Sequence, residues 1–294
     1  MALLHTPYDG SSQPFSVGLK PIADEDWLEV DDRLEKQLLE KKRLLAERHD
    51  RVFRAEEETL AAQREVLDLV LSHLASRGAP KYQLSGATVE VAGLTVPLDL
   101  FAPLEATARI VQEDLVLMRK GADGYRLAAA CLCFPSSWSL AEKYSRSMAE
   151  IHESVPGFND GRMGAVVARL FDNLKIGQLV CRYNWSIYDD PKLHHPEPRQ
   201  IAPDVGSDQM RALARLFVRV ERQTLRRLPV SGDILFTIKV HHDPIDCLRR
   251  HPDRVQLAGG LRDQLLALDA QQLAYKGLTA HRSTLAAMLE RLTD

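Results

Sequence analysis

Three segments in the second half of the chain alternate apolar and polar residues, and this pattern constrains the fold most. They are residues 178–188 (QLVCRYNWSIY), 215–229 (RLFVRVERQTLRRLP) and 233–242 (DILFTIKVHH). A period of two places successive side chains on opposite faces of a β-strand, so the pattern predicts three strands. Their expected apolar faces carry Leu179, Cys181, Tyr183, Trp185 and Ile187; Leu216, Val218, Val220, Arg222 and Thr224; and Ile234, Phe236, Ile238 and Val240.

Two helices are expected ahead of these strands. Ser139 and Glu142 have the spacing of a capping box, which marks the start of a helix. Apolar positions then recur four residues apart as far as His152, and Pro156 ends the pattern. A second helix is predicted over residues 160–175. His152 should therefore lie on the apolar stripe of a single continuous helix.

A β-hairpin is predicted before the helices. Residues 113–135 read EDLVLMRKGADGYRLAAACLCFP, with two apolar runs on either side of glycine-containing turn residues. The order is then two strands, two helices and three strands, which is the order of a PAS domain. We therefore expect an α+β fold with a PAS-like antiparallel sheet that holds a small ligand, including haem, between helices and sheet.

Helical extensions are expected on both sides of this sheet. Residues 24–77 combine a recurrent Leu/Val spacing with many charges, which favours helices packed over a sheet, with a coiled-coil partner helix as the alternative. The last part of the chain also has a helical pattern. We predict an N-terminal irregular segment with helices at 1–80, a haem-binding domain at 81–250 and C-terminal helices at 251–294.

Composition excludes several classes of protein. Hydrophobic residues make up 45% and charged residues 27% of the 294 residues, which is ordinary for a globular protein. A net charge of −3 gives no basic field for nucleic acid, and no run approaches the length of a membrane span. Four cysteines are too few for a disulfide framework. Standard nucleotide-binding glycine loops are absent. We expect a reduced, cytoplasmic protein.

His152 and His194 are the two candidates for a metal-binding histidine. A neutral imidazole in an apolar pocket, as expected for His152, is a good axial ligand for haem iron. A core histidine bonded to a backbone carbonyl would show the same sequence pattern. His194 lies in the loop 189–198, where a second histidine and acidic residues could form a two-histidine, one-carboxylate iron site. Adjacent histidines on extended backbone point to opposite sides, which disfavours a shared ion.

Charged residues on the second predicted strand are further candidates. Arg222 and Thr224 continue its apolar face, and a buried arginine needs a partner such as a haem propionate or an internal acid. Arg226 belongs to a cluster suited to planar carboxylates. Glu221 points to the other face by simple alternation. A structural salt-bridge network would explain the same arginines.

Four stretches of the chain resemble one family. They are VGLKPIADEDWLEVDD (17–32), FPSSWSLAEKYSRSMAEIHESVPGF (134–158), CRYNWSIYDD (181–190) and RVERQTLRRLPVSGDILFTIKVHHDPI (219–245). In these stretches the sequence is similar to the haem-dependent oxidative N-demethylases, long catalogued as a domain of unknown function. Together the stretches are quite specific, and they are spread over most of the chain.

The resemblance implies a catalytic subunit with a PAS-like fold and haem b. Such a subunit oxidises the N-methyl group of a small secondary amine, such as dimethylamine, with O2 as the oxidant. The products are a primary amine and formaldehyde. Electrons come from NADPH through partner reductase subunits that carry FMN and a [2Fe–2S] cluster. A chain without its own nucleotide loop or cluster cysteines fits this division of labour.

The resemblance also favours His152 over His194 as the axial ligand, because in haem-binding PAS domains the axial histidine comes from the helical side that faces the sheet. Arg222 is then the candidate for pairing with a propionate or for a hydrogen bond to bound oxygen. Thr224 could relay protons through water. Glu221 could hold the cationic amine if its side chain reaches the pocket.

Aromatic and amide side chains complete the expected site. Tyr183 and Trp185 would provide apolar walls that tolerate a methylammonium cation. Asn184 and Arg226 are expected to contact the cofactor. A haem PAS sensor or haem carrier without turnover is the alternative function, and a protein whose inner sheet face is simply packed, without haem, is a third.

Overall fold

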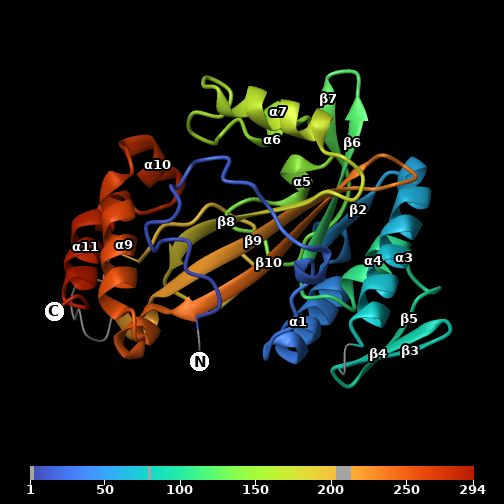
Figure 1. Cartoon of the computed structure of the whole chain (residues 1–294), viewed down its shortest axis with the longest axis horizontal. Coiled ribbons are helices and arrows are strands. Elements are labelled where there is room, and N and C mark those ends of the chain that lie inside the picture. Colours follow the sequence, from blue (N-terminus) through green and yellow to red (C-terminus); the bar gives the residue numbers. More distant parts are fainter. Residues whose placement is uncertain (1–2, 79–80, 203–212) are drawn as a thin grey trace.

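The protein is described by a computed structural model that covers residues 3–78, 81–202 and 213–294. Its centre is a seven-stranded antiparallel sheet in the order β1-β8-β9-β10-β6-β7-β2 (Figure 1). A separate antiparallel sheet has the order β3-β4-β5. The strands are β1 (Lys20–Pro21), β2 (Phe53–Ala55), β3 (Tyr82–Ser85), β4 (Thr88–Val91), β5 (Leu94–Pro97), β6 (Asp114–Gly121), β7 (Gly124–Cys131), β8 (Leu179–Tyr188), β9 (Phe217–Arg227) and β10 (Ile234–Pro244). The expected α+β class is confirmed.

The alternating segments form the long central strands β8, β9 and β10. Across them Tyr183 pairs with Arg222, and Arg222 pairs with Lys239, so these three residues share one face of the sheet. The predicted hairpin is also present, with Gly121 opposite Gly124 at the turn between β6 and β7. Alternation therefore predicted three of the seven strands of this sheet, and the apolar runs around the turn residues predicted two more.

Helices from the first third of the chain cover one face of the sheet (Figure 1). Among them Lys41 is fully buried, and its ammonium donates to the carbonyls of Ala108 and Val111 at 3.2 and 3.0 Å. The helices are α1 (Leu34–Glu47), α2 (His49–Val52), α3 (Leu60–Ser76) and α4 (Pro103–Ala108), with 3-10 turns at Asp24–Asp26 and Glu57–Thr59. The Lys41 bonds join α1 to the end of α4 and to the loop before β6. Apolar residues of α1 and α3 share one core with residues of β6, β7 and β10, so the helices pack over the sheet as expected.

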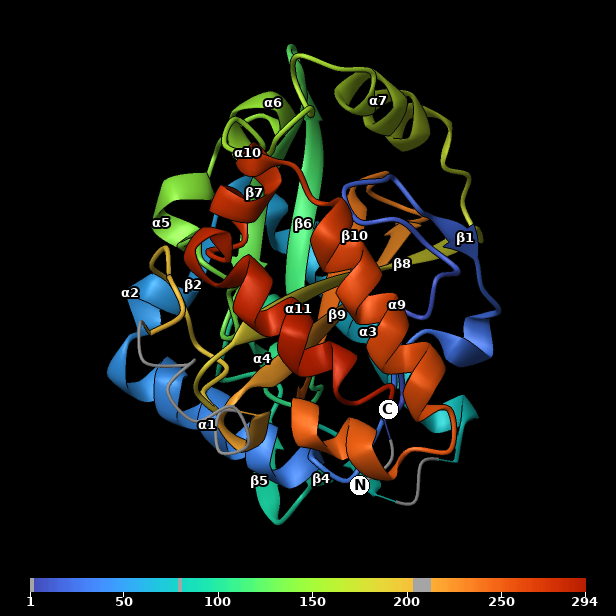
Figure 2. The ribbon, with the colours of Figure 1, turned by 90° about the vertical axis from the view of Figure 1, so that its left-hand side faces the viewer.

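The C-terminal helices cover the other end of the same strands (Figure 2). Their apolar residues form a core with Trp185, Ile187, Val218 and Val220 of β8 and β9. The expectation of helices in this part of the chain is confirmed. They are α9 (Arg254–Ala267), α10 (Ala270–Tyr275) and α11 (Arg282–Glu290), with 3-10 turns at Ile245–Arg250 and Thr279–His281.

The opposite face of the sheet is covered by the predicted crossover, but its first helix is not continuous. It is divided into α5 (Leu140–Lys143) and α6 (Met148–Ile151), while α7 spans Met163–Asn173. Ser145 has a φ of 61°, which a right-handed helix cannot contain. Ser147 then forms a second capping box with Glu150. The prediction of one helix was wrong because this second start signal reads as part of the first helix.

Segments that precede residue 81 also join the central sheet. β1 pairs with β8, and β2 pairs with β7, so both outermost strands come from the region expected to be an N-terminal extension. The proposed boundaries between 1–80, 81–250 and 251–294 remain predictions. No helix in the described part of the chain combines the length and apolar composition needed to cross a bilayer.

Candidate functional site

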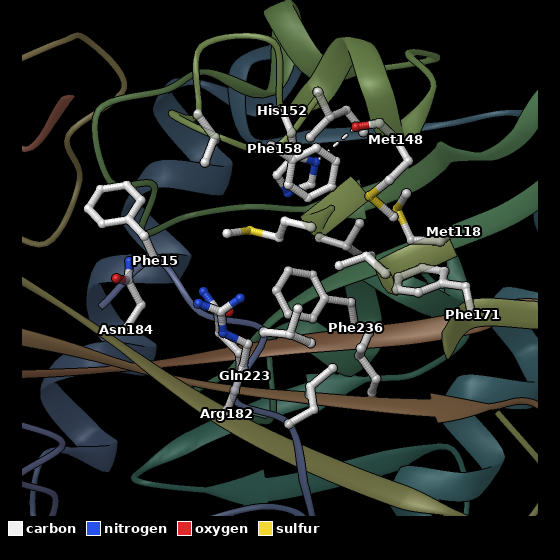
Figure 3. Close-up of a pocket in the computed structure, with 18 of the residues that line it drawn as sticks. Phe15, Met118, Met148, His152, Phe158, Phe171, Arg182, Asn184, Gln223 and Phe236 are labelled. Atoms are coloured by element: carbon white, nitrogen blue, oxygen red, sulfur yellow. Dashed lines mark hydrogen bonds between the residues drawn. The ribbon is translucent and has the colours of Figure 1, made fainter. Parts of the chain in front are cut away.

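An apolar cavity of about 220 Å³ lies between the sheet and the crossover helices (Figure 3). Strand residues such as Leu225 and Phe236 form one wall, and Met148 and Phe158 from the helical side form the other. Most side chains around it are apolar, so a group bound there would contact mainly apolar atoms. The apolar lining comprises Phe15, Val17, Leu19, Val116, Met118, Leu127, Met148, Ile151, Val155, Phe158, Met163, Val167, Phe171, Leu225 and Phe236.

A second cavity of about 740 Å³ adjoins the first and is more polar. The two share His152, Asn184, Gln223 and several apolar side chains as a common wall. Glu221 lines only the larger cavity. Binding pockets for cofactors and small ligands are typically about 300–1,000 Å³, so the two adjoining spaces together are large enough for a cofactor and a small substrate.

His152 lines both cavities. Its Nδ1 lies 2.9 Å from the carbonyl oxygen of Met148, and its ring stacks on Phe158 at 4.0 Å with an interplanar angle of 10° (Figure 3). Burial lowers the pKa of His152, so the ring is neutral at pH 7. An Nδ1–H donor to Met148 leaves the lone pair on Nε2, the atom a metal needs. His152 thus shows both features expected from the sequence: it contacts a backbone carbonyl, and it lies in an apolar pocket.

Arg182 of β8 is a cavity residue that the sequence did not single out. Its guanidinium points toward the helical side of the cavity, and its buried Nε has no hydrogen-bond partner among the described residues (Figure 3). Burial lowers the pKa of Arg182, although the charge of Glu221 opposes this effect. A half-buried cation whose Nε lacks a hydrogen-bond partner is incompletely stabilised, so this position favours an anionic group in the bound ligand.

Polar residues cluster where the two cavities meet. Asn184 accepts from Lys276 Nζ through its Oδ1 at 3.3 Å, and Glu221 accepts from Gln223 Nε2 at 3.0 Å. Burial lowers the pKa of Lys276 to about 8, with the charge of Glu221 acting in the opposite direction. Where the two cavities meet, Glu221 therefore lies among cationic and amide groups, and Glu153 and Asp160 also line the larger cavity. Asn184 and Glu221, both singled out from the sequence, do line the larger cavity.

Arg222 and Thr224 lie on the other face of the sheet. Arg222 donates to the carbonyl of Trp27 at 2.8 Å, and its Nε lies 3.1 Å from Oε1 of Glu29. The hydroxyl of Thr224 is 2.6 Å from that of Thr237. Neither lines the cavities next to His152. The expectation that they face the same pocket as His152 is wrong, because both faces of this sheet are covered and carry apolar residues, and Arg222 and Thr224 lie on the face away from the cavities.

Three further candidates are also on that second face. Tyr183 is 37% exposed and contacts the ring of His5. The indole nitrogen of Trp185 donates to Gln264 at 2.6 Å under the C-terminal helices. Arg226 stacks on the ring of Trp27 at 4.2 Å. None of the three lines either cavity, so they cannot form the walls or cofactor contacts expected of them there.

His194, the reserve ligand, also lies away from both cavities. Its Nδ1 is 2.8 Å from the carbonyl oxygen of Cys133. The neighbouring acids are occupied as well, because Asp189 and Asp190 both pair with Arg199. The structure thus brings together His152, Asn184 and Glu221 from the predicted set and adds Arg182. The signal for Arg182 was its place on the same strand face as Asn184.

One comparison with known proteins assigns the chain to a family. A family model described as "Haem-dependent oxidative N-demethylase, alpha subunit-like" matches residues 18–286. The match includes both cavities apart from a few N-terminal wall residues. Its description implies a haem-dependent oxidoreductase that acts as one subunit of a larger complex. The chain belongs to the haem-dependent oxidative N-demethylase family, alpha subunit-like.

Proposed function

We propose that this chain binds haem b in the apolar cavity through His152 and oxidatively demethylates a small secondary amine held in the adjoining polar cavity. The observation that carries the proposal is the environment of His152. Its imidazole is neutral, fixed by the Met148 carbonyl and placed at the wall common to both spaces. A ligand at this position would have one part in the apolar space and the other beside the polar groups.

The residues present fit haem in two respects. The neutral imidazole of His152 would offer Nε2 to the haem iron, and its Nδ1 already contacts the Met148 carbonyl, as is usual for ligating histidines. The buried Nε of Arg182 supports a nearby carboxylate, and a haem propionate is one. When bound, haem supplies the iron at which O2 is used to oxidise an N-methyl group.

The arrangement of the sheet supports a PAS-like fold. In chain order the five long strands are β6, β7, β8, β9 and β10, and in space the first lies beside the last, as β8-β9-β10-β6-β7. The crossover with α5, α6 and α7 lies between β7 and β8 in the sequence and covers the cavity face. This agrees with the strand and helix order expected for a PAS-like domain whose helices and sheet enclose the ligand.

Glu221 is the proposed contact for the amine. Its side chain is buried and lines the larger cavity, where a carboxylate can accept hydrogen bonds from an ammonium group. Gln223 donates to it and orients it. The demethylation requires the secondary amine, O2, two electrons and two protons, and it yields a primary amine, formaldehyde and water. The electrons are proposed to come from NADPH through partner subunits with FMN and a [2Fe–2S] cluster.

Amine-dependent formaldehyde release tests the proposal. The haem-loaded chain is supplied with NADPH and a ferredoxin–reductase pair as electron source, with catalase present to remove peroxide. We expect equal amounts of formaldehyde and methylamine from dimethylamine. The Glu221→Gln variant should raise KM for the amine by about tenfold or more, since a hydrogen bond to a charged group contributes about 1.5–3 kcal/mol.

Gln256→Glu is the matched control, because this exposed residue is remote from both cavities and its variant should behave as the wild type. A chain that binds haem and accepts electrons yet releases no formaldehyde would contradict the proposal. That result would favour the non-catalytic haem sensor or carrier.

A further inference from the structure

Two histidines and a glutamate meet on the face of the sheet opposite the cavities. His5 comes from the N-terminal segment, Glu29 from the segment before α1, and His241 from β10. We propose that His5, Glu29 and His241 form a binding site for a divalent transition-metal ion of the zinc class. This site is separate from the haem cavity, and the proposal does not depend on the proposed function.

The distances between the ligand atoms suit a single ion. Nε2 of His5 lies 2.8 Å from Oε1 of Glu29, and Nε2 of His241 lies 3.1 Å from Oε2 of the same carboxylate. One ligand atom from each of the three residues lies within 4.8 Å of the others. Zinc binds nitrogen and oxygen at about 2.0–2.2 Å in tetrahedral geometry, which places neighbouring ligand atoms about 3–3.6 Å apart. Small side-chain shifts are enough to satisfy this geometry.

The second nitrogen of His241 faces an acid, as is usual for ligating histidines. Nδ1 of His241 lies 3.8 Å from Oδ2 of Asp31, which also pairs with Lys239 Nζ at 3.1 Å. Without an ion, Nε2–H of His241 donates to Oε2 of Glu29 at 3.1 Å. A metal ion between these two atoms would take the place of that proton, and the proton on Nδ1 would then be directed toward Asp31.

The neighbouring charge and the types of ligand atom favour zinc over magnesium and calcium. Arg222 is fixed beside Glu29 with Nε 3.1 Å from Oε1, and it repels any cation at this position. Hard ions such as Mg²⁺ and Ca²⁺ depend on several oxygen ligands, and this site offers one carboxylate. Two imidazoles and a carboxylate suit zinc and its transition-metal neighbours, which gain more from nitrogen ligands. We therefore expect zinc to bind and magnesium and calcium not to bind.

The ion would fasten the N-terminal segment to the sheet. His5 contacts this face through His241 and Tyr183, whereas Phe15 and Val17, further along the same segment, line the apolar cavity on the other face. His241 is almost fully buried, but His5 and Glu29 are partly exposed. Solvent can thus reach the site from one side, and a water molecule can complete the coordination.

Zinc titration of the tag-free, metal-stripped chain tests the site. We expect binding with a stoichiometry of one, measured by calorimetry, and visible absorption bands of tetrahedral Co²⁺ when cobalt replaces zinc. His5→Ala and Glu29→Gln should each weaken zinc binding by at least about tenfold, because losing a ligand costs at least as much as losing an outer-shell partner. A fixed molar excess of zinc should raise the Tm of the wild type but not that of His5→Ala.

His49→Ala is the matched control. Nε2 of His49 lies 2.9 Å from Glu105, so this residue forms a similar histidine–carboxylate pair, and it is not part of the three-residue cluster. This variant should bind zinc as the wild type does. His5→Gln provides a second substitution should His5→Ala unfold, as judged by circular dichroism. Wild-type zinc affinity in the folded His5 and Glu29 variants, or no stoichiometric zinc binding by the wild type, would overturn the proposal.

Discussion

At the scale of single residues, the chemistry of the site depends on which face of a strand a side chain occupies. The alternating pattern correctly placed Glu221 and Arg222 on opposite faces of the strand, but it did not indicate which face borders the cavities. Both faces of this sheet are covered, so apolar residues mark neither face as the ligand side. Arg222 forms an ion pair with Glu29 and donates to the carbonyl of Trp27, whereas the buried Nε of Arg182 has neither a hydrogen bond nor an ion pair with the described residues.

Arg182→Leu should have opposite effects on stability and haem binding. Removing a half-buried cation whose Nε lacks a hydrogen-bond partner should leave the free energy of unfolding of the haem-free chain unchanged or higher. The loss of a charged hydrogen-bond donor should weaken haem binding by about ten- to a hundredfold. Haem titration and denaturant unfolding measure the two effects. Arg182→Lys, which keeps the charge, is the control and should retain more affinity; equal losses in both variants would count against a propionate contact.

Lys276 should make stability depend on pH in the alkaline range. Burial among Trp185, Phe15 and Arg182 lowers its folded-state pKa to about 8 from 10.5, against the opposing charge of Glu221. Between these values the unfolded chain binds more protons than the folded chain, so stability rises with pH relative to a variant without the amine. The unfolding free energy of the wild type minus that of Lys276→Met should increase from pH 8 to pH 10. A difference that stays constant over this range would refute the assignment.

At the scale of elements, the crossover shows what local signals can and cannot predict. Ser139 and Ser147 each begin a short helix with a capping box, and the second start was readable as the repeat of SLAE by SMAE. The break between them depends on Ser145 in a left-handed conformation, which no propensity indicates for serine. His152 therefore caps a single-turn helix, and neighbouring elements must hold it in place.

Gly164 is expected to control the position of His152 through Phe158. A Cβ on Gly164 would lie 2.9 Å from the carbonyl oxygen of Phe158 and 3.3 Å from its ring, and that ring stacks on His152. Gly164→Ala should displace the ring and speed haem release several-fold. Gly259→Ala is a matched helical control, since the nearest atom there is 3.8 Å away. Transfer of haem to apomyoglobin measures the release rate; equal rates in both variants would show that the stack is not needed.

At the scale of the whole molecule, long-range contacts were beyond what the sequence could predict. Three of the long strands were predicted from alternation, the hairpin from its turn residues and the helical regions from their apolar spacing, but β1 and β2 are too short to give a pattern. They pair with strands distant in sequence and place residues before 81 at both edges of the sheet. The cavity wall likewise combines Phe15 from one end of the chain with Tyr275 from the other. These contacts between distant segments depend on tertiary packing, which local sequence patterns do not indicate.

The absorption spectrum of the haem-reconstituted chain tests the central claim most directly. Wild type, His152→Ala and His194→Ala are each mixed with hemin and separated from the excess by gel filtration. His194 makes a similar contact with a backbone carbonyl but lies outside both cavities, so its variant is the matched control. We predict a Soret band for a bound, histidine-ligated haem in wild type and His194→Ala, and its loss in His152→Ala. Normal haem content and an unchanged spectrum in folded His152→Ala would contradict the account.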